Sequence, residues 1–166
     1  GYGFNKSHAV AYSIVGYWTA YMKANFPLVF YTTMLNGNLD EADAFMAEAR
    51  KLDIQILPPH VNNSKLLFTV EGDKGIRVGF NAIKGVGPKA VDSIVNTQPY
   101  ASIDDYFERN DKSAINKGVV ASLIKSGAFD GLGLITEEND IPQELNDKFK
   151  FNTIENQLYV YLNREQ

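Results

Sequence analysis

The residues of this chain best suited to bind an anion lie between positions 80 and 91. This stretch reads Phe-Asn-Ala-Ile-Lys-Gly-Val-Gly-Pro-Lys-Ala-Val. Gly85 and Gly87 allow a sharp turn without side chains over its outer face. Pro88 suits the first turn of a helix, because the N–H group that it lacks would be unpaired there. We therefore predict a short helix, a Gly-Val-Gly turn and a second helix, with free N–H groups that form an anion site.

Charged and apolar side chains of the same stretch fit this interpretation. Lys84 and Lys89 flank the turn with positive charge. Val86 can hold the two helices together with three further apolar residues, Ile83, Val91 and Ile94. The pattern is typical of a helix-hairpin-helix, a module that binds nucleic-acid phosphates without reading bases. The simpler alternative is a glycine-capped helix end followed by a new helix.

A second candidate phosphate site is formed by Lys6, Ser7 and His8. They come just before and at the start of a helix that we predict over 7–25, with Ser7 as its N-cap. A lysine charge, a hydroxyl and an imidazole donor at a helix N-terminus suit a phosphate. The alternative is a plain cap with a lysine that faces solvent.

Other polar groups do not indicate catalysis or metal binding. The acidic residues at 40–43 sit at a predicted helix start, where the macrodipole alone explains them. His60 follows two prolines in what we interpret as a rigid connector. The chain has two histidines and no cysteine, which argues against a structural zinc site. We predict no catalytic and no metal-binding residue.

Composition and charge limit the class of protein. The chain has 166 residues, 45% of them apolar, and is about one domain long. No apolar run approaches the roughly 20 residues that span a membrane. The net charge of −4 argues against a general nucleic-acid binder. However, the charges are unevenly distributed. Residues 61–100 carry five basic and three acidic residues, whereas residues 134–166 carry seven acidic and three basic ones. A small basic patch at the glycine turn is therefore compatible with the sequence.

The elements that must position these sites are mainly helical. Apolar spacing, prolines and glycines predict helices over 7–25, 27–37, 39–52, 103–110 and 115–125, besides the two helices of the 80–97 module. Asn38 and Ser102 are the expected caps of two of them. Strands are predicted over 54–57, 66–71 and 76–80, the last two joined by a turn at 72–75. The fold class expected is α+β, mainly helical with a small β element.

Several blocks of the sequence, in this order, closely resemble the alpha subunits of bacterial DNA polymerase III, the C-family replicative polymerases. The resemblance runs from residue 1 to about residue 133. The blocks are Gly-Tyr-Gly-Phe-Asn-Lys-Ser-His-Ala-Val-Ala-Tyr at 1–12, Tyr-Met-Lys-Ala-Asn-Phe-Pro at 21–27, Ile-Leu-Pro-Pro-His-Val-Asn at 56–62, Phe-Thr-Val-Glu-Gly at 68–72, the glycine turn, and Leu-Ile-Lys-Ser-Gly-Ala-Phe-Asp at 123–130.

The resemblance implies a division of the chain and a role for each part. Residues 1–26 would end a fingers domain, 27–133 would form a helix-hairpin-helix domain that binds duplex DNA, and 134–166 would be an acidic linker. It also implies that Lys6 and His8 lie near the triphosphate of the incoming deoxynucleotide. The palm of that family, with its aspartates, has no counterpart here. We therefore expect an internal segment, or alternatively a processed product, of a longer nucleotidyltransferase that uses Mg²⁺. We expect no polymerase activity and no cofactor in this segment alone.

The stretch 157–162, Gln-Leu-Tyr-Val-Tyr-Leu, allows two interpretations. One is a degenerate sliding-clamp peptide with Tyr161 as its terminal aromatic residue. The other, which we prefer, is a segment leading to an oligonucleotide-binding domain.

The sequence thus predicts a cytoplasmic, membrane-free segment of a replicative DNA polymerase that binds the primer–template duplex through backbone phosphates. Two alternatives remain open: a non-catalytic module that docks to a sliding clamp or another replisome protein, and a repair protein with the same hairpin module.

Overall fold

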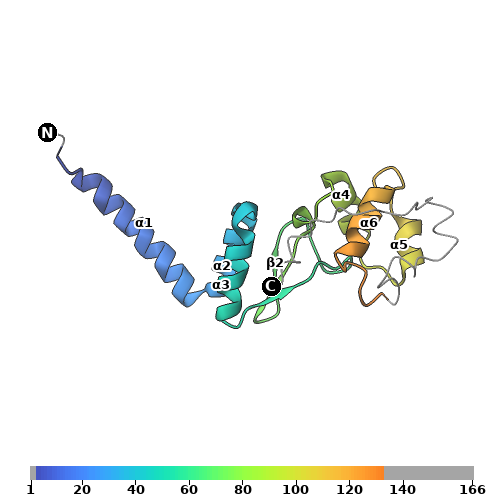
Figure 1. Cartoon of the computed structure of the whole chain (residues 1–166), viewed down its shortest axis with the longest axis horizontal. Coiled ribbons are helices and arrows are strands. Elements are labelled where there is room, and N and C mark those ends of the chain that lie inside the picture. The colour runs from blue at the N-terminus through green and yellow to red at the C-terminus, as the bar shows by residue number, and fades with distance from the viewer. Residues whose placement is uncertain (1–2, 133–166) are drawn as a thin grey trace.

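The computed structural model describes residues 3–132, which form an elongated chain of helices around a small sheet (Figure 1). Helix α1 extends from one end of the molecule, and α4, α5 and α6 gather at the other. The α+β, mainly helical class is confirmed. The helices are α1 (Lys6–Asn25), α2 (Pro27–Gly37), α3 (Ala42–Lys51), α4 (Pro88–Thr97), α5 (Ile103–Arg109) and α6 (Lys117–Lys125), with 3₁₀ turns η1 (Leu39–Glu41) and η2 (Phe80–Ala82). The strands are β1 (Gln55–Leu57), β2 (Thr69–Glu71) and β3 (Gly75–Arg77).

Helix α1 begins one residue earlier than expected, and its cap is Asn5 rather than Ser7. The Asn5 side chain accepts a hydrogen bond from the N–H of His8 at 3.2 Å. This is the bond that a capping side chain makes three residues into a helix. None of the α1 side chains is buried, although most are apolar; Trp18 is 63% exposed.

The first hydrophobic core lies between α2, α3 and the sheet. It contains Tyr31, Leu35, Met46, Ile54 and Ile76, among others. Helix α3 is shorter than predicted, because η1 takes up its first turn, and the Asn38 side chain makes no capping bond there. The side-chain amide of Asn38 instead donates to the carbonyl of Met34 at 3.4 Å.

The sheet has the order β1-β3-β2. The predicted hairpin is confirmed, with β2 and β3 antiparallel around the turn at 72–74, but its strands are shorter than expected. The sequence did not reveal that β1 pairs with β3 in parallel. Arg77, on the central strand, links the two outer segments of the sheet. Its guanidinium binds both carboxylate oxygens of Glu71 and donates to the carbonyl of Pro58 at 2.7 Å. The contact with Arg77 holds the pKa of Glu71 below its ordinary value.

The second core fills the space between η2, the glycine turn, α4, α5 and α6. Phe80, Ile94, Tyr106, Leu123 and Phe129 are among its fully buried side chains. The expected Ser102 cap of α5 is confirmed, since Ser102 accepts from the N–H of Asp105 at 3.2 Å. Helix α6 ends at Lys125, and the chain then turns at Ser126 and Gly127 as predicted; the φ of +72° at Gly127 favours glycine.

The connector 58–64 joins the two cores. Val61 belongs to the second core, and its N–H donates to the carbonyl of Ala128 at 2.8 Å. Ser64 is fully buried; its hydroxyl accepts from the N–H of His60 at 2.9 Å and donates to the carbonyl of Val78 at 2.7 Å. The interpretation of 58–60 as a connector therefore agrees with the structure.

Two sequence-based expectations concern residues for which the structure gives no description. The acidic linker at 134–166 and the stretch 157–162 both lie outside residues 3–132. Across the described part of the chain, no helix combines the length and the hydrophobicity needed to cross a bilayer.

Protonation of His60 should destabilise the folded chain. Burial, and then the positive charge of Arg77, lowers the pKa of His60 below 6.5. Its Nδ1 also accepts a bond from the N–H of Asn62 at 3.1 Å, which protonation at that nitrogen would remove. Because the unfolded chain then binds the proton more tightly, the free energy of unfolding should fall as the pH drops below about 6.5, by at most about 1.4 kcal/mol per pH unit.

Urea denaturation at about pH 7.5 and about pH 5.5 measures this loss. His60→Gln should flatten the pH dependence, whereas His8→Gln, at the exposed start of α1, should keep it. Equal slopes in all three proteins would contradict the role given to His60.

Candidate nucleic-acid interface

The Gly-Val-Gly turn and the helix after it form as predicted, but the helix expected before the turn is only the 3₁₀ turn η2, followed by Ile83 in an extended conformation. The two glycines of the turn serve different purposes. Gly85 has a φ of +92°, a conformation that side chains disfavour. Gly87 has a φ of −84° and a ψ of 167°, which any residue can adopt. A Cβ atom on Gly87 would meet no atom of residues 3–132 within 4 Å, so the absence of a side chain leaves the described surface open at this point. The N–H of Val86, donating to the carbonyl of Ile83 at 3.2 Å, closes the turn.

Helix α4 begins directly at this turn, with Pro88 in its first position. The carbonyl of Gly87 accepts from the N–H groups of Ala90 and Val91 at 3.0 and 3.1 Å. Within residues 3–132, the N–H groups of Gly85, Gly87 and Lys89 find no hydrogen-bond acceptor. The turn and the helix start therefore present donors together with the positive end of the α4 dipole.

Val86 anchors the turn in the second core. It is 9% exposed and packs with Ile83, Ala90 and the buried residues of α6. The neighbouring side chains Lys84 and Lys89 are exposed. All five predicted residues of this site, Lys84, Gly85, Val86, Gly87 and Lys89, thus lie on one turn, with the apolar side chain inward and both lysines outward.

Helix α6 supports the turn from behind. A Cβ atom built on Gly85 would lie 2.8 Å from Oγ of Ser122, so the two backbones approach closely. No local sequence pattern predicts this contact, because Ser122 is one polar residue in a helix of ordinary composition. Helix α6 contributes buried side chains to the same core as the glycine turn and α4.

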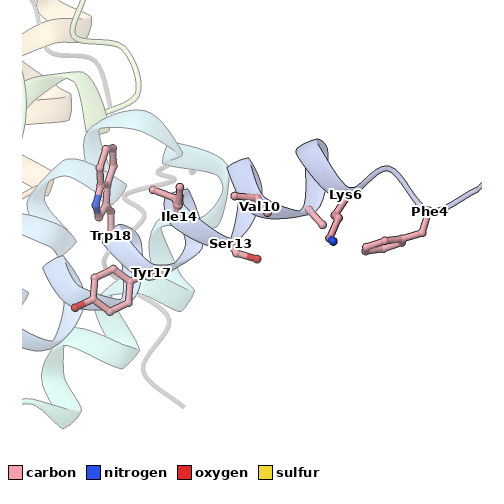
Figure 2. Close-up of a pocket in the computed structure, with 8 residues that line it drawn as sticks. Phe4, Lys6, Val10, Ser13, Ile14, Tyr17 and Trp18 are labelled. Atoms are coloured by element: carbon pink, nitrogen blue, oxygen red, sulfur yellow. The ribbon is translucent and has the colours of Figure 1, made fainter.

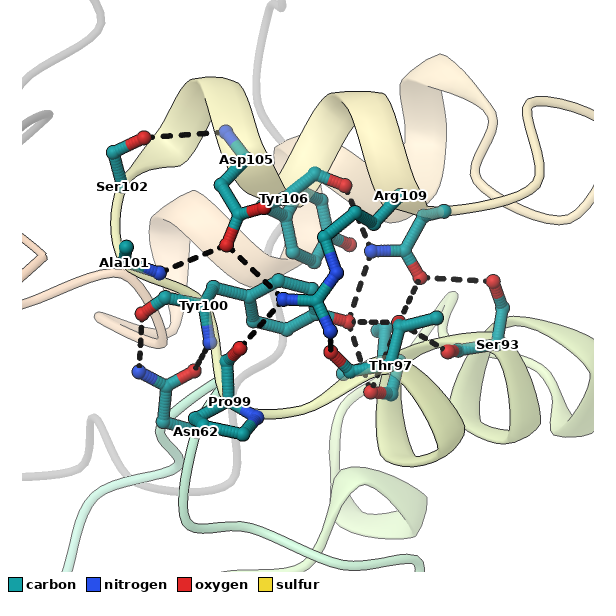
Figure 3. Close-up of polar contacts among 12 residues, drawn as sticks. Asn62, Ser93, Thr97, Pro99, Tyr100, Ala101, Ser102, Asp105, Tyr106 and Arg109 are labelled. Carbon is teal, nitrogen blue, oxygen red and sulfur yellow. Dashed lines mark hydrogen bonds and ion pairs between the residues drawn. The ribbon is translucent and has the colours of Figure 1, made fainter.

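A polar network fixes the other end of α4 (Figure 3). The hydroxyl of Tyr100 donates to the carbonyl of Ile94 at 2.8 Å and accepts from the amide of Asn110 at 2.9 Å. Asn110 Oδ1 in turn accepts from the hydroxyl of Ser93 at 2.8 Å. Burial raises the pKa of the Tyr100 hydroxyl, so this group stays protonated as a donor. The network holds α4 against the start and the end of α5.

Arg109 adds a second set of contacts to the same network. Its guanidinium donates to the carbonyls of Thr97 and Pro99, and pairs with Asp105 at 3.1 Å (Figure 3). The N–H of Ala101, followed by Arg109, holds the pKa of Asp105 below its ordinary value. The amide of Asn62, from the connector, bonds both backbone groups of Tyr100 at 2.8 and 2.9 Å. Sequence analysis did not predict these contacts, because Asp105 and Arg109 are ordinary charged residues of a short helix and Asn62 lies 38 residues from its partner Tyr100.

The side chains of the second candidate site, Lys6, Ser7 and His8, do not converge on one point. Lys6 lies with Phe4, Val10, Ser13, Ile14, Tyr17 and Trp18 along an exposed groove on one side of α1 (Figure 2). Ser7 and His8 do not line that groove, and the His8 ring instead contacts the ring of Tyr12, with centroids 4.3 Å apart. The structure brings the three residues to one helix start, at the opposite end of the molecule from the glycine turn (Figure 1).

A metal-binding cluster is not seen in the described region. No group of three or more histidine, cysteine, aspartate or glutamate side chains within residues 3–132 could hold a metal ion. The described residues therefore do not fit the metal site of a nucleotidyltransferase.

The sequence of the chain is similar to those of known proteins with a helix-hairpin-helix motif. A family model described as "Helix-hairpin-helix motif" matches residues 53–138, which include the glycine turn and helices α4 to α6. Proteins named DNA polymerase III subunit alpha are similar over most of the chain. The one from Mycobacterium tuberculosis is 45% identical over 139 residues, that from Saccharopolyspora erythraea 43% over 140, and that from Pseudomonas aeruginosa 40% over 140.

These matches cover 80% of this chain but only 12% of each relative. The chain therefore corresponds to a small part of a much larger protein in the relatives that it matches.

Replacing each glycine of the turn by alanine should have different effects on the stability of the chain. Gly85→Ala forces a side chain into a positive φ and against Ser122, and should reduce the free energy of unfolding by about 1–3 kcal/mol. Gly87→Ala meets no atom and should change it by less than about 0.5 kcal/mol. Denaturant titration of the two variants tests this, and equal losses would contradict the different roles of the glycines.

Proposed function

Because the chain belongs to the helix-hairpin-helix family, we propose that it holds the primer–template duplex in a bacterial replicative DNA polymerase. The observation that carries the proposal is that the N–H groups of Gly85, Gly87 and Lys89 find no acceptor among residues 3–132 and lie beside the exposed side chains of Lys84 and Lys89. Phosphate oxygens are acceptors with negative charge, so they satisfy these donors and the α4 dipole together.

The binding that we propose does not depend on base sequence. Base edges are read by side chains such as arginine, asparagine and glutamine placed in a groove. The outer face of this turn instead offers backbone N–H groups, glycines and two lysines. Such groups contact phosphates, which are alike at every position of a duplex.

The rest of the chain is assigned by the same proposal. Residues 1–26 form the end of a fingers domain, where Lys6, Ser7 and His8 contact the triphosphate of the incoming deoxynucleotide. Residues 27–133 bind the duplex, and 134–166 lead to a following domain. The parent enzyme is a DNA-directed DNA polymerase whose metal ligands for Mg²⁺ lie elsewhere in its sequence, so the present chain alone does not polymerise.

Duplex DNA binding should be weak, independent of sequence and sensitive to salt. Because the turn can meet only a few phosphates, a plot of log K against log salt concentration should have a slope of roughly −2 to −4, at about −0.9 per phosphate. Lys89→Ala should reduce the slope by about 1, whereas Lys51→Ala, on α3, should leave it unchanged. Fluorescence anisotropy with one duplex and its scrambled counterpart measures both effects; a marked preference for either duplex would sink the proposal.

In the full-length parent polymerase, the start of α1 and the glycine turn should affect different steps. Lys6→Ala and His8→Ala should slow incorporation more than they weaken duplex binding, by roughly the 1.5–3 kcal/mol of a hydrogen bond to a charged group. Lys89→Ala should do the reverse. Pre-steady-state incorporation and a DNA titration on all three variants test this difference. If Lys6 and His8 variants behave like the Lys89 variant, the triphosphate assignment is wrong.

A further inference from the structure

We propose that Lys23, Tyr31 and Glu48 form an anchor that sets the direction of α1 relative to the rest of the molecule. These residues come from α1, α2 and α3, respectively. We call them the α1 anchor. The part of this proposal that concerns nucleotide incorporation rests on the proposed function. The part that concerns the direction of α1 rests only on the contacts between these residues.

Helix α1 needs such an anchor because little else holds it to the body. None of its side chains is buried, and it extends away from α2 and α3 (Figure 1). The helical backbone conformation breaks at Phe26, whose φ of −134° and ψ of 54° are not helical, and α2 begins at Pro27, which has no N–H to continue the helical hydrogen bonds. The backbone at this break can bend, so side-chain contacts must fix the angle between the two helices.

The contacts of the anchor converge on one carboxylate oxygen. Lys23 Nζ lies 2.8 Å from Oε2 of Glu48, and the hydroxyl of Tyr31 donates to the same oxygen at 3.0 Å. Lys23 Nζ also lies 5.6 Å from the centroid of the Tyr31 ring and 5.9 Å from that of Phe30. The ammonium group therefore meets a carboxylate and the faces of two aromatic rings from α2.

One residue of the α1 anchor belongs to the hydrophobic core. Tyr31 is 1% exposed and belongs to the first core. Its hydroxyl places the carboxylate of Glu48, and that carboxylate places Lys23 in the last turn of α1. Hydrogen bonding to Glu48 raises the pKa of Lys23, and hydrogen bonding to Lys23 lowers that of Glu48, so both groups carry their charges at neutral pH.

The length of α1 makes its direction important. Twenty residues at about 1.5 Å each give a helix of about 30 Å, with Lys6 and His8 at the far end. A change of about 10° at the anchor would move that end by about 5 Å, which exceeds the roughly 1 Å at which positioning errors already slow a reaction. Lys23, Tyr31 and Glu48 are therefore positioning residues for any role of the α1 N-terminus.

A distance measurement on the chain itself tests the anchor. The sequence has no cysteine, so Ala11→Cys and Ala44→Cys place two spin labels at exposed positions of α1 and α3 without competing thiols. Double electron–electron resonance should give one narrow distribution of distances between the labels. Lys23→Met and Glu48→Gln should each broaden or shift it, and Lys23→Arg, which can keep the ion pair and the ring contact, should restore the original distribution.

Arg50→Met is the matched control, because it also removes a positive charge on an exposed face of this region and lies outside the anchor. Unchanged distributions in both Lys23→Met and Glu48→Gln would overturn the proposal, as would an equal change in the Arg50 control. Circular dichroism of each variant shows whether the helices remain folded.

In the parent polymerase, Lys23→Met should slow incorporation several-fold with duplex affinity unchanged, and Lys23→Arg should recover the rate. A full rate in Lys23→Met, despite a broadened distance distribution, would overturn the positioning role in catalysis. If instead Lys6→Ala and His8→Ala have no effect on incorporation, the proposed nucleotide site fails while the geometric anchor stands, so the two failures can be told apart.

Discussion

The burial of Val86 is the constraint on which the candidate interface depends. A valine between two glycines would ordinarily occupy an exposed turn, but this one packs into the core formed with α4 and α6. Burying such a side chain stabilises the fold by about 1.5–3 kcal/mol, and it draws the turn onto the helices. Once Val86 points inward, the backbone N–H groups of Gly87 and Lys89 and both flanking lysines are left on the outer side.

The remaining contacts of this half keep the turn rigid. Gly85 accepts the positive φ and the close approach of Ser122, and the network around Tyr100 and Asn110 fixes the far end of α4. Ser64 and Asn62 tie the connector to the sheet and to the start of α5. An anion site made of backbone donors works only if those donors are already in place, since ordering them on binding would offset the affinity.

Much of this could be predicted from local sequence patterns. The prolines at 27 and 88 marked two helix starts, Ser102 marked a cap, and the Gly-Val-Gly run marked the turn; all four agree with the structure. The errors were also local. Asn5, two residues before Ser7, is the side chain that caps α1, and the Asn38 side chain bonds back to the carbonyl of Met34 instead of capping the next helix.

What could not be predicted depends on residues far apart in the sequence. The parallel pairing of β1 with β3, the support of Gly85 by Ser122 and the bonds from Asn62 to Tyr100 each join segments separated by about twenty residues or more. No local pattern encodes such partners, because each depends on how the two cores pack. The same holds for the contact of Lys23 with Glu48, which crosses from α1 to α3.

The central claim is that the backbone of the glycine turn and of the α4 start contacts DNA phosphates. An NMR titration of the ¹⁵N-labelled chain with a short duplex at low salt tests it directly, because it reports on each N–H group separately. The account predicts that the amide signals of Gly85, Gly87 and Lys89 shift most, while those of α3 stay in place. Binding that shifts other amides and leaves the three turn signals unchanged would contradict it.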